Sequence, residues 1–342
     1  MSPSPAAPSP IAGPPIAGPR VVALAAALAI GLGTLTGCAA FSHDEAADDG
    51  ALTVVAGLYP LQWIAQQVVG DQAEVEDLTN PGAEPHDLEL TPKQTADVAD
   101  ADLVVYLGGL QAAVDTAVDQ VATGDPLDVA TAADLQPLSH DGHDDLDHTD
   151  SESEVSDSLS GQSEESTDPS DLDPHFWQDP MRMASVADAI AAELGTIDPG
   201  HSATYERNAK AVRVRLQALN RQYRAGLADC ARDTIVVSHN AFGYLAKYGL
   251  YVEPIAGLSP DAEPTPADLA RLQELIESKG ITAVFGERLA PAQLAETLAS
   301  DMHVTTAVLD PIEGLTSATS TDTYLSLMRD NLSALKKANG CR

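Results

Sequence analysis

The chain has 342 residues, 44% of them hydrophobic, with 18 basic and 52 acidic side chains and a formal net charge of −34. This hydrophobic content suits about two domains with cores of their own and argues against a disordered chain. The negative charge repels phosphate backbones and so argues against nucleic acid as a partner, while most of the carboxylates are expected to form a solvated surface.

The N-terminal segment predicts export. An apolar run that begins at Val21 is typical of a secretory signal peptide and is shorter than the roughly 20 residues that a spanning helix needs. It ends in LTGC at residues 35–38, which resembles the bacterial lipobox. We therefore expect removal of residues 1–37 and a lipid on Cys38 that anchors the protein to the outer face of the cytoplasmic membrane. The alternative is a buried thiol in an uncleaved helix.

After a polar tether at residues 38–50, short β-branched runs alternate with segments that carry helix start signals. This alternation predicts an α/β fold with mainly parallel sheets. The predicted strands are Thr53 to Ala56, Ala73 to Leu78, Leu103 to Tyr106, Thr234 to Val237, Thr282 to Phe285 and Thr305 to Leu309. Helix starts with a capping side chain before a proline are predicted at Thr91-Pro92, Asp179-Pro180, Asp198-Pro199 and Thr265-Pro266.

A long amphipathic helix is predicted in the middle of the chain. Its apolar residues recur at spacings of three and four and form one stripe: Tyr205, Ala209, Val212, Leu216, Leu219, Tyr223 and Leu227. Strand and helix units stand on both sides of it. We therefore predict two Rossmann-like lobes, residues 51–197 and 230–342, joined by a rigid helix at 198–229. An ordinary packing helix is the alternative.

Residues 139–173 break this pattern, because they are rich in Ser, Asp and Glu and almost without apolar side chains. Such a segment cannot bury enough surface to order itself, so we expect a disordered insertion in the first lobe. It contains His140, His143 and His148 among several aspartates. These histidines are either an auxiliary site for metal capture or part of a solvated acidic loop.

Two further cysteines, Cys230 and Cys341, lie before a predicted strand and next to the C-terminus. Export makes a disulfide between them possible. We expect this disulfide to clamp the C-terminal tail onto the second lobe. Two free thiols are the alternative.

Four potential metal ligands lie next to predicted strands or helix starts. His86 and His175 precede capped helices, while His239 and Asp310 directly follow strands. In an open parallel sheet, ligands bind outside the carboxyl ends of the strands, so these side chains can converge between the lobes. Three imidazoles and a carboxylate form a tetrahedral set suited to Zn²⁺, although a single histidine beside a turn is more often a hydrogen-bonded loop residue. Glu287, at the same edge, either supports a ligand or is a plain crevice carboxylate.

Four segments in matching order resemble the metal-binding (cluster A-I) substrate-binding lipoproteins of zinc and manganese ABC importers. They are Pro85-His86-Asp87, DPHFWQDP at 173–180, SHNAFGYLAKYGL at 238–250 and LDPIEGL at 309–315. The resemblance runs from about Thr53 to the C-terminus. It implies two α/β lobes with the metal at their interface, held by His86 and His175 from the first lobe and by His239 and Asp310 from the second.

In that family a glutamate at the position of His239 goes with manganese, and imidazole suits Zn²⁺ better than a further carboxylate does. The resemblance therefore implies a monomer without enzymatic activity that captures Zn²⁺ outside the cell and delivers it to an ABC permease and its ATPase subunit. The alternatives are Mn²⁺ as the cargo, a surface adhesin on the same scaffold, and a secreted zinc hydrolase, for which the sequence has no HExxH motif.

Overall fold

The computed structural model of the chain describes residues 52–138 and 171–342. The predicted signal peptide, tether and lipid site at Cys38 lie outside this part, and so do His140, His143 and His148. The described residues belong to one compact unit, Gly50–Arg342. Within this described part, no helix has the length and apolar character to cross a lipid bilayer.

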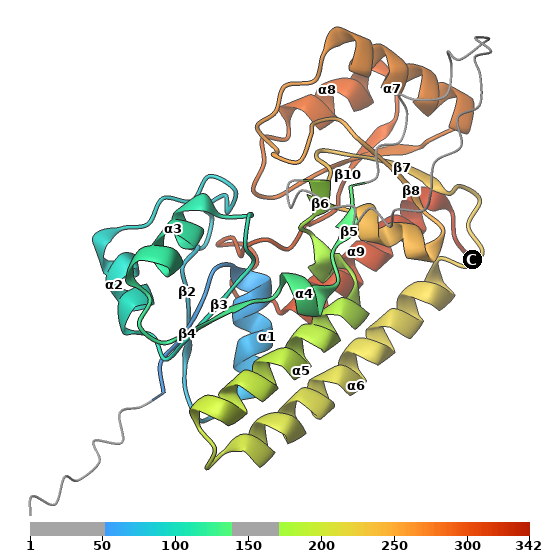
Figure 1. Cartoon of the computed structure of the whole chain (residues 1–342). Helices are drawn as coiled ribbons and strands as arrows, with labels where there is room; N and C mark the ends of the chain where they lie inside the picture. Colours follow the sequence, from blue (N-terminus) through green and yellow to red (C-terminus); the bar gives the residue numbers. More distant parts are fainter. Residues whose placement is uncertain (1–51, 139–170) are drawn as a thin grey trace, which may run out of the picture. The chain divides into compact units, whose positions relative to one another are not determined.

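The first lobe contains a four-stranded parallel sheet in the order β2-β1-β3-β4 (Figure 1). Its strands are β1 (Val54–Ala56), β2 (Val75–Asp77), β3 (Leu103–Tyr106) and β4 (Asp125–Asp128). Its helices are α1 (Tyr59–Val69), α2 (Pro92–Asp100), α3 (Ala112–Val121), α4 (Ala130–Ala133) and α5 (Pro180–Ile197). Successive strand residues point to opposite faces of the sheet. Val55 and Val104 pack with α2 and α3, while Val54 and Val105 pack with α1 and α5.

The second lobe repeats this plan with a parallel sheet in the order β10-β9-β7-β8. Its strands are β7 (Thr234–Val237), β8 (Tyr251–Pro254), β9 (Ala283–Gly286) and β10 (Thr305–Val308). Its helices are α7 (Pro266–Lys279), α8 (Gln293–Asp301) and α9 (Tyr324–Asn339). Val236 and Val284 pack against α7 and α8, whereas Val237 and Phe285 face the core that continues into the first lobe.

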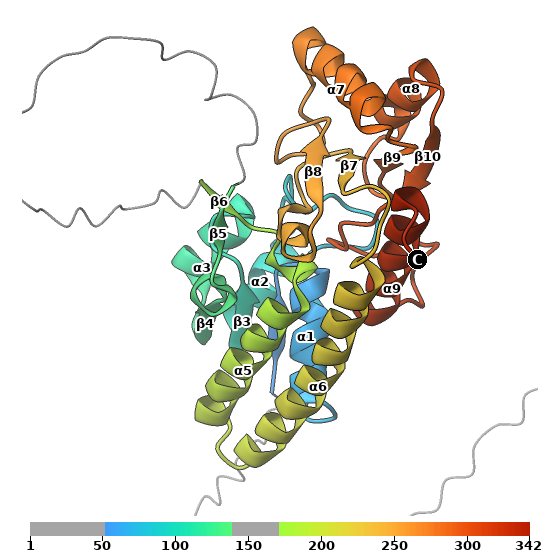
Figure 2. The same ribbon diagram turned by 90° about the vertical axis from the view of Figure 1, so that its right-hand side faces the viewer.

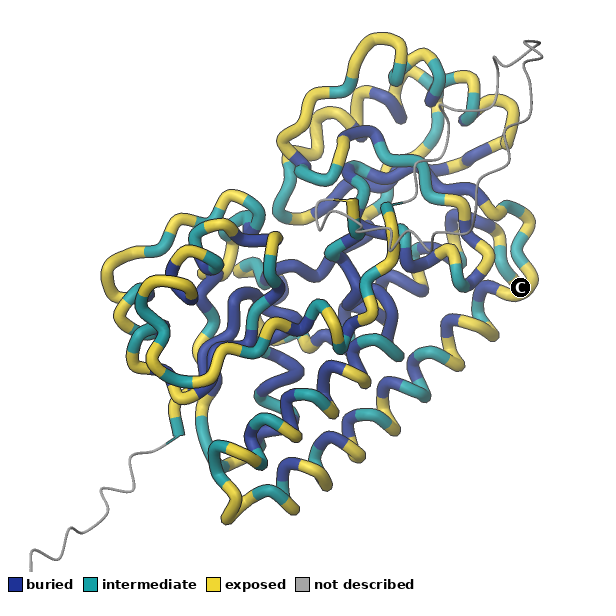
Figure 3. Tube along the Cα trace, viewed as in Figure 1, coloured by how far each residue is buried: buried dark blue, intermediate teal, exposed yellow. Residues whose placement is uncertain are grey.

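Helix α6 (Ser202–Gly226) joins the lobes. The predicted apolar stripe from Tyr205 to Leu227 is buried, and buried and exposed positions alternate along the helix (Figure 3). Figure 2 shows α6 beside α5 and α1 of the first lobe and close to α9 of the second, in agreement with its contacts. The predicted fold class is confirmed: an α/β protein with parallel sheets in two lobes that one long helix connects.

Most predicted helix starts are found where the capping residues placed them. Thr91 and Thr265 form capping boxes, and the Asp179 carboxylate accepts a hydrogen bond from the Met181 N–H. The predicted start at Asp198-Pro199 is wrong, because α6 begins at Ser202. Asp198 instead ends α5, and its Oδ2 accepts a hydrogen bond from the Tyr205 hydroxyl at 2.6 Å.

A short antiparallel pair flanks the predicted insertion. Strand β5 (Gln136–Pro137) pairs with β6 (Leu172–Asp173), so the last residues of the segment predicted to be disordered belong to a strand. The Tyr244 hydroxyl of the second lobe donates to the Asp173 carbonyl at 2.7 Å and accepts from the Gln136 N–H at 3.1 Å. This pair therefore ties the base of the insertion to the second lobe.

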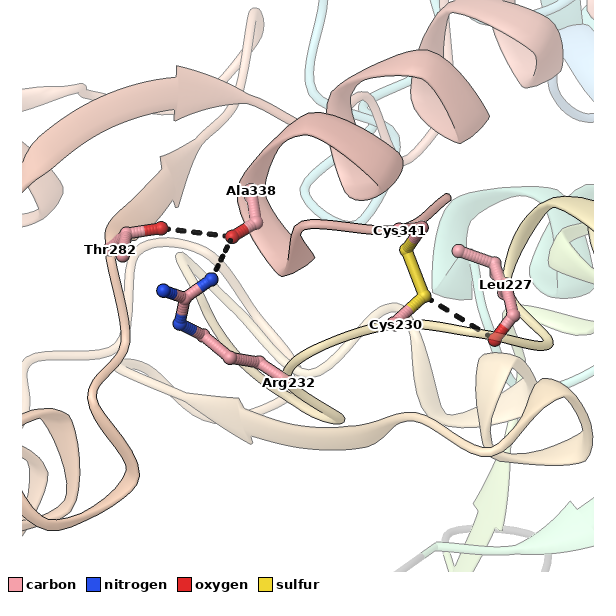
Figure 4. Close-up of a disulfide and its surroundings, with 6 residues drawn as sticks. All are labelled: Leu227, Cys230, Arg232, Thr282, Ala338 and Cys341. Atoms are coloured by element: carbon pink, nitrogen blue, oxygen red, sulfur yellow. Dashed lines mark hydrogen bonds between the residues drawn. A yellow bond between two sulfur atoms is a disulfide. The ribbon is translucent and has the colours of Figure 1, made fainter.

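The predicted disulfide between Cys230 and Cys341 is present (Figure 4). Next to it, the Ala338 carbonyl at the end of α9 accepts hydrogen bonds from Arg232 and from the Thr282 hydroxyl, at 3.4 and 2.9 Å. The C-terminal tail is thus fixed to the segment that leads into β7, as expected.

Replacing both disulfide cysteines by serine should lower the free energy of unfolding by about 2 to 5 kcal/mol, because the bond closes a loop between residues 111 positions apart. Urea unfolding of the wild type and the double variant, each with and without a reductant, measures this. The reductant should destabilise only the wild type. Equal stability of the two proteins without reductant would show that the bond does not form or contributes nothing.

Candidate metal centre

Three imidazoles and one carboxylate meet between the two lobes. His86 comes from the loop between β2 and α2, His175 from the loop between β6 and α5, His239 from the loop after β7, and Glu313 from the loop after β10. One potential ligand atom of each lies within 4.8 Å of those of the others, and no second group of this kind occurs in the described part of the chain. Glu313 Oε1 lies 3.2 Å from the Nε2 of His175, 3.4 Å from that of His239 and 3.6 Å from that of His86.

The group is buried, and its ligand atoms have no polar neighbours other than one another that meet hydrogen-bond geometry. The side chains of His175 and His239 are fully buried, that of Glu313 is 1% exposed, and only His86, at 12%, reaches solvent. The Nε2 atoms of the three histidines and both carboxylate oxygens of Glu313 have no hydrogen-bond partner among the described residues. Buried polar atoms are nearly always paired in folded proteins, and unpaired ones are costly. Unpaired nitrogen and oxygen atoms that face one another fit a single cation.

The opposite ring nitrogens of two histidines are fixed by carboxylates. His175 Nδ1 lies 2.9 Å from Asp173 Oδ1, and His239 Nδ1 lies 2.7 Å from Glu287 Oε1. The same oxygens accept the backbone N–H groups of these histidines. An imidazole that donates through Nδ1 presents a lone pair at Nε2, which is the arrangement that metal-binding histidines use.

Of these two carboxylates, sequence reasoning named only Glu287, and its contact with His239 agrees with the expected supporting position. Asp173 was missed because it was assigned to the disordered insertion. A signal was present in the Asp-Pro-His spacing, since an aspartate often accepts the backbone N–H two residues on. Here that N–H belongs to His175.

Asp310, the predicted carboxylate ligand, does not join the group. Its Oδ2 accepts a hydrogen bond from Arg288 Nε at 3.0 Å, and its Oδ1 accepts the Ile312 N–H at 2.8 Å. The loop turns at Ile312, whose φ is 63°, and the carboxylate of Glu313 enters the crevice instead. The structure therefore brings together three of the four predicted residues and puts Glu313 in the place of Asp310. The sequence offers both acids after the strand and does not reveal the turn between them.

The charges of the group reinforce one another. Burial alone would raise the pKa of Glu313, but the neighbouring His175, His239 and His86 hold that pKa well below its ordinary value. Burial opposes protonation of His239, yet Glu287 and Glu313 more than offset it and raise the pKa of His239 to about 10. The pKa of His175 is also raised, because Asp173 and Glu313 outweigh the effect of burial. Without a metal these carboxylates favour the protonated forms of His239 and His175, and a divalent cation can replace the protons.

Fold and site together define a two-lobed α/β protein whose facing loops present a closed set of metal-ligand atoms. The family model described as "ZnuA: Zinc-uptake complex component A periplasmic" matches residues 54–338. The zinc-binding lipoprotein AdcA of Streptococcus pneumoniae (serotype 4, strain TIGR4) is 35% identical over 302 residues, which cover 84% of this chain and 56% of AdcA. The high-affinity zinc uptake system protein ZnuA of Bacillus subtilis is 34% identical over 291 residues, which cover 83% of this chain and 86% of that protein.

The crystal structure of the Zn(II)-bound ZnuA-like domain of S. pneumoniae AdcA superimposes with a TM-score of 0.67 and 32% sequence identity, over 85% of this chain and 99% of that domain. The chain spans little more than half the length of the complete AdcA. It belongs to the ZnuA family of zinc-uptake complex components.

The pKa values predict how the stability of the metal-stripped protein depends on pH. A folded-state pKa of about 10 for His239 gives a stabilisation that is complete below its unfolded value of about 6.5 and is lost as the pH rises through 10. The lowered pKa of Glu313 acts in the opposite sense, so its stabilisation is present above about pH 4.5 and is lost in acid.

Thermal unfolding of metal-stripped wild type and His239→Gln between pH 6 and pH 10 tests this. The Tm of the wild type should exceed that of the variant, and this difference should be largest near pH 6 and shrink toward pH 10. A difference that stays constant over this range would contradict the raised pKa of His239.

Proposed function

We propose that this chain is an exported binding protein that captures Zn²⁺ outside the cell and delivers it to an ABC-type importer. One observation carries the proposal: the buried Nε2 atoms of three histidines and the carboxylate of Glu313 face one another without other partners. Membership of a family of zinc-uptake components supports the choice of metal. So do the relatives named as zinc-binding proteins.

The ligand types favour Zn²⁺ over Mn²⁺. Three imidazole nitrogens and one carboxylate oxygen match the tetrahedral nitrogen and oxygen ligation of zinc at about 2.0 to 2.2 Å, whereas Mn²⁺ prefers more oxygen ligands. Glu313 Oε1 lies 3.2 to 3.6 Å from the three Nε2 atoms, which is about the spacing between neighbouring ligand atoms around a tetrahedral ion with bonds of this length. Mn²⁺ therefore remains the weaker alternative for this set.

The same set favours storage and release of an ion over catalysis. A catalytic zinc keeps one coordination position open for water, with three protein ligands. Here the three histidines and Glu313 supply four ligand atoms, which would complete the tetrahedral coordination of an ion. The observation thus supports a binding protein and gives no support to the zinc hydrolase considered from the sequence.

Ligation would involve both lobes. His86 and His175 belong to the first lobe, and His239 and Glu313 to the second. The Trp177 and Gln178 side chains, which follow His175, donate hydrogen bonds to the Pro311 carbonyl at 2.8 and 2.5 Å. These bonds hold the loop of Glu313 against the segment of His175 before an ion arrives. A bound ion would add its own bonds across the same interface, and the importer would then recognise the loaded shape.

The remaining parts of the proposal concern residues outside the described structure. A lipid on Cys38 would confine the protein to the outer face of the cytoplasmic membrane, close to the permease and its ATPase subunit. His140, His143 and His148 would serve as an auxiliary capture site. The buried crevice contains its full ligand set without them.

The metal-stripped wild type should bind one Zn²⁺ tightly and Mn²⁺ far more weakly. His239→Ala should weaken zinc binding by more than about 100-fold, because it removes a ligand and loss of an outer partner alone costs up to about that much. Competition titration against a chromophoric chelator near pH 7 measures both affinities.

His303→Asn is the matched control. His303 is exposed and has a φ of 55°, a left-handed conformation that asparagine also adopts readily, so this variant should bind zinc as the wild type does. No tight zinc site in the wild type, or equal losses in both variants, would contradict the proposed function.

A further inference from the structure

Asp310 is held by hydrogen bonds on every side, although it is not one of the converging ligand residues. Its backbone N–H donates to Asn331 Oδ1 at 2.8 Å, and its carbonyl accepts from Asn331 Nδ2 at 2.6 Å. Its carboxylate accepts from the Ile312 N–H and from Arg288 Nε. The residue is 5% exposed. These bonds fix the loop at the end of β10 to α9 and to the loop that follows β9.

The bond to Ile312 closes the turn that leads to Glu313. Ile312 has a φ of 63°, a left-handed conformation that is unfavourable for a β-branched residue and persists only where the surroundings impose it. The Asp310 carboxylate supplies one such constraint by accepting the Ile312 N–H at 2.8 Å. Without that acceptor the loop can relax toward an ordinary backbone conformation, which would turn the next residue away from the crevice.

The position of the Glu313 carboxylate depends on the backbone conformation of this turn. Its carboxylate has no hydrogen-bond partner anywhere in the described residues, so no polar neighbour other than the imidazoles orients it. The loop itself is held on both sides: the Pro311 carbonyl accepts from Trp177 and Gln178, and the Leu315 carbonyl accepts from the Gly82 N–H at 2.7 Å. Asp310 holds the turn between these two anchor points.

We propose that Asp310 is a positioning residue that sets the place of the Glu313 carboxylate through the Ile312 N–H and is itself kept out of the metal's ligand set by Arg288. This inference rests on the proposed function. It also bears on selectivity, because a second carboxylate at the ion would give the more oxygen-rich set that Mn²⁺ prefers. Arg288 donates to Asp310 Oδ2 and so occupies the oxygen that Ile312 leaves free.

Paired variants separate a positioning role from direct ligation. Asparagine at position 310 retains an oxygen that can accept the Ile312 N–H, whereas alanine does not. Asp310→Ala should therefore weaken zinc binding about 10- to 100-fold, the usual loss for an outer partner, while Asp310→Asn stays within a few-fold of wild type. Competition titration gives the affinities, and circular dichroism and Tm of the metal-stripped proteins report whether each variant folds.

Two further measurements use the site itself. The visible spectrum of bound Co²⁺ reports ligand number, and Asp310→Ala should change it while Asp310→Asn should not. In a Glu313→Gln background, Asp310→Ala should cause less than about a twofold additional loss of zinc affinity, because its effect passes through Glu313. Asp188→Ala is the matched control, since it breaks another aspartate–arginine pair, between α5 and Arg213 of α6, that includes none of the converging ligand residues, and it should leave zinc affinity unchanged.

The outcomes are distinct. Asparagine and alanine variants that lose affinity equally, with a further loss on top of Glu313→Gln, would overturn the inference in favour of direct ligation by Asp310. A tight site that Asp310→Ala leaves unchanged would overturn it in favour of a merely local structural role. A wild-type protein without a tight zinc site would overturn the proposed function and this inference with it.

Discussion

A buried group of nitrogen and oxygen atoms, with no hydrogen-bond partners among the described residues, faces inward from both lobes. The Nε2 atoms of His86, His175 and His239 lie within 3.6 Å of Glu313 Oε1 in a crevice from which solvent is nearly excluded. Desolvated polar atoms of this kind cost free energy in the absence of a ligand. Around them the protein must therefore be rigid enough to keep them together, and the arrangement of the two lobes provides that rigidity.

The two parallel sheets supply the geometry. The loops that follow β2, β7 and β10, together with the loop that follows β6, bring their side chains to the same interface. Helix α6 packs on elements of both lobes, and one apolar core runs through them. At the interface, Trp177 and Gln178 bond the Pro311 carbonyl, and Tyr244 bonds the Asp173 carbonyl. Since Asp173 also holds the ring of His175, these contacts connect the packing of the lobes to the orientation of a ligand.

The parts of the fold that follow from local chemistry could be predicted from the sequence. The inner strands β1, β3, β7 and β9 are recognisable because residues buried on both faces are β-branched or apolar. Strands β4 and β8 were missed because each contains a proline and an acidic residue. Both lie at a sheet edge, where proline is tolerated, so their place in the sheet and not their composition makes them strands.

In the site too, some residues could be predicted from local sequence signals and others could not. The three histidines could be predicted because strand ends and helix caps locate their loops, whereas the choice between Asp310 and Glu313 depends on one turn. That turn places Ile312 in the left-handed region of backbone conformation, and nothing in the sequence predicts this conformation for an isoleucine. Asp173 was hidden for a related reason, since its role depends on a two-residue strand formed with the far side of a long insertion.

We propose that Zn²⁺ is held between the lobes by three histidines and Glu313. A crystal structure of the zinc-loaded protein, with anomalous diffraction measured on both sides of the zinc absorption edge, tests it most directly. We expect one strong anomalous peak about 2.0 to 2.2 Å from the Nε2 atoms of His86, His175 and His239 and from a Glu313 oxygen. A peak bound by the Asp310 carboxylate in place of Glu313, or one that lies outside this crevice, would contradict it.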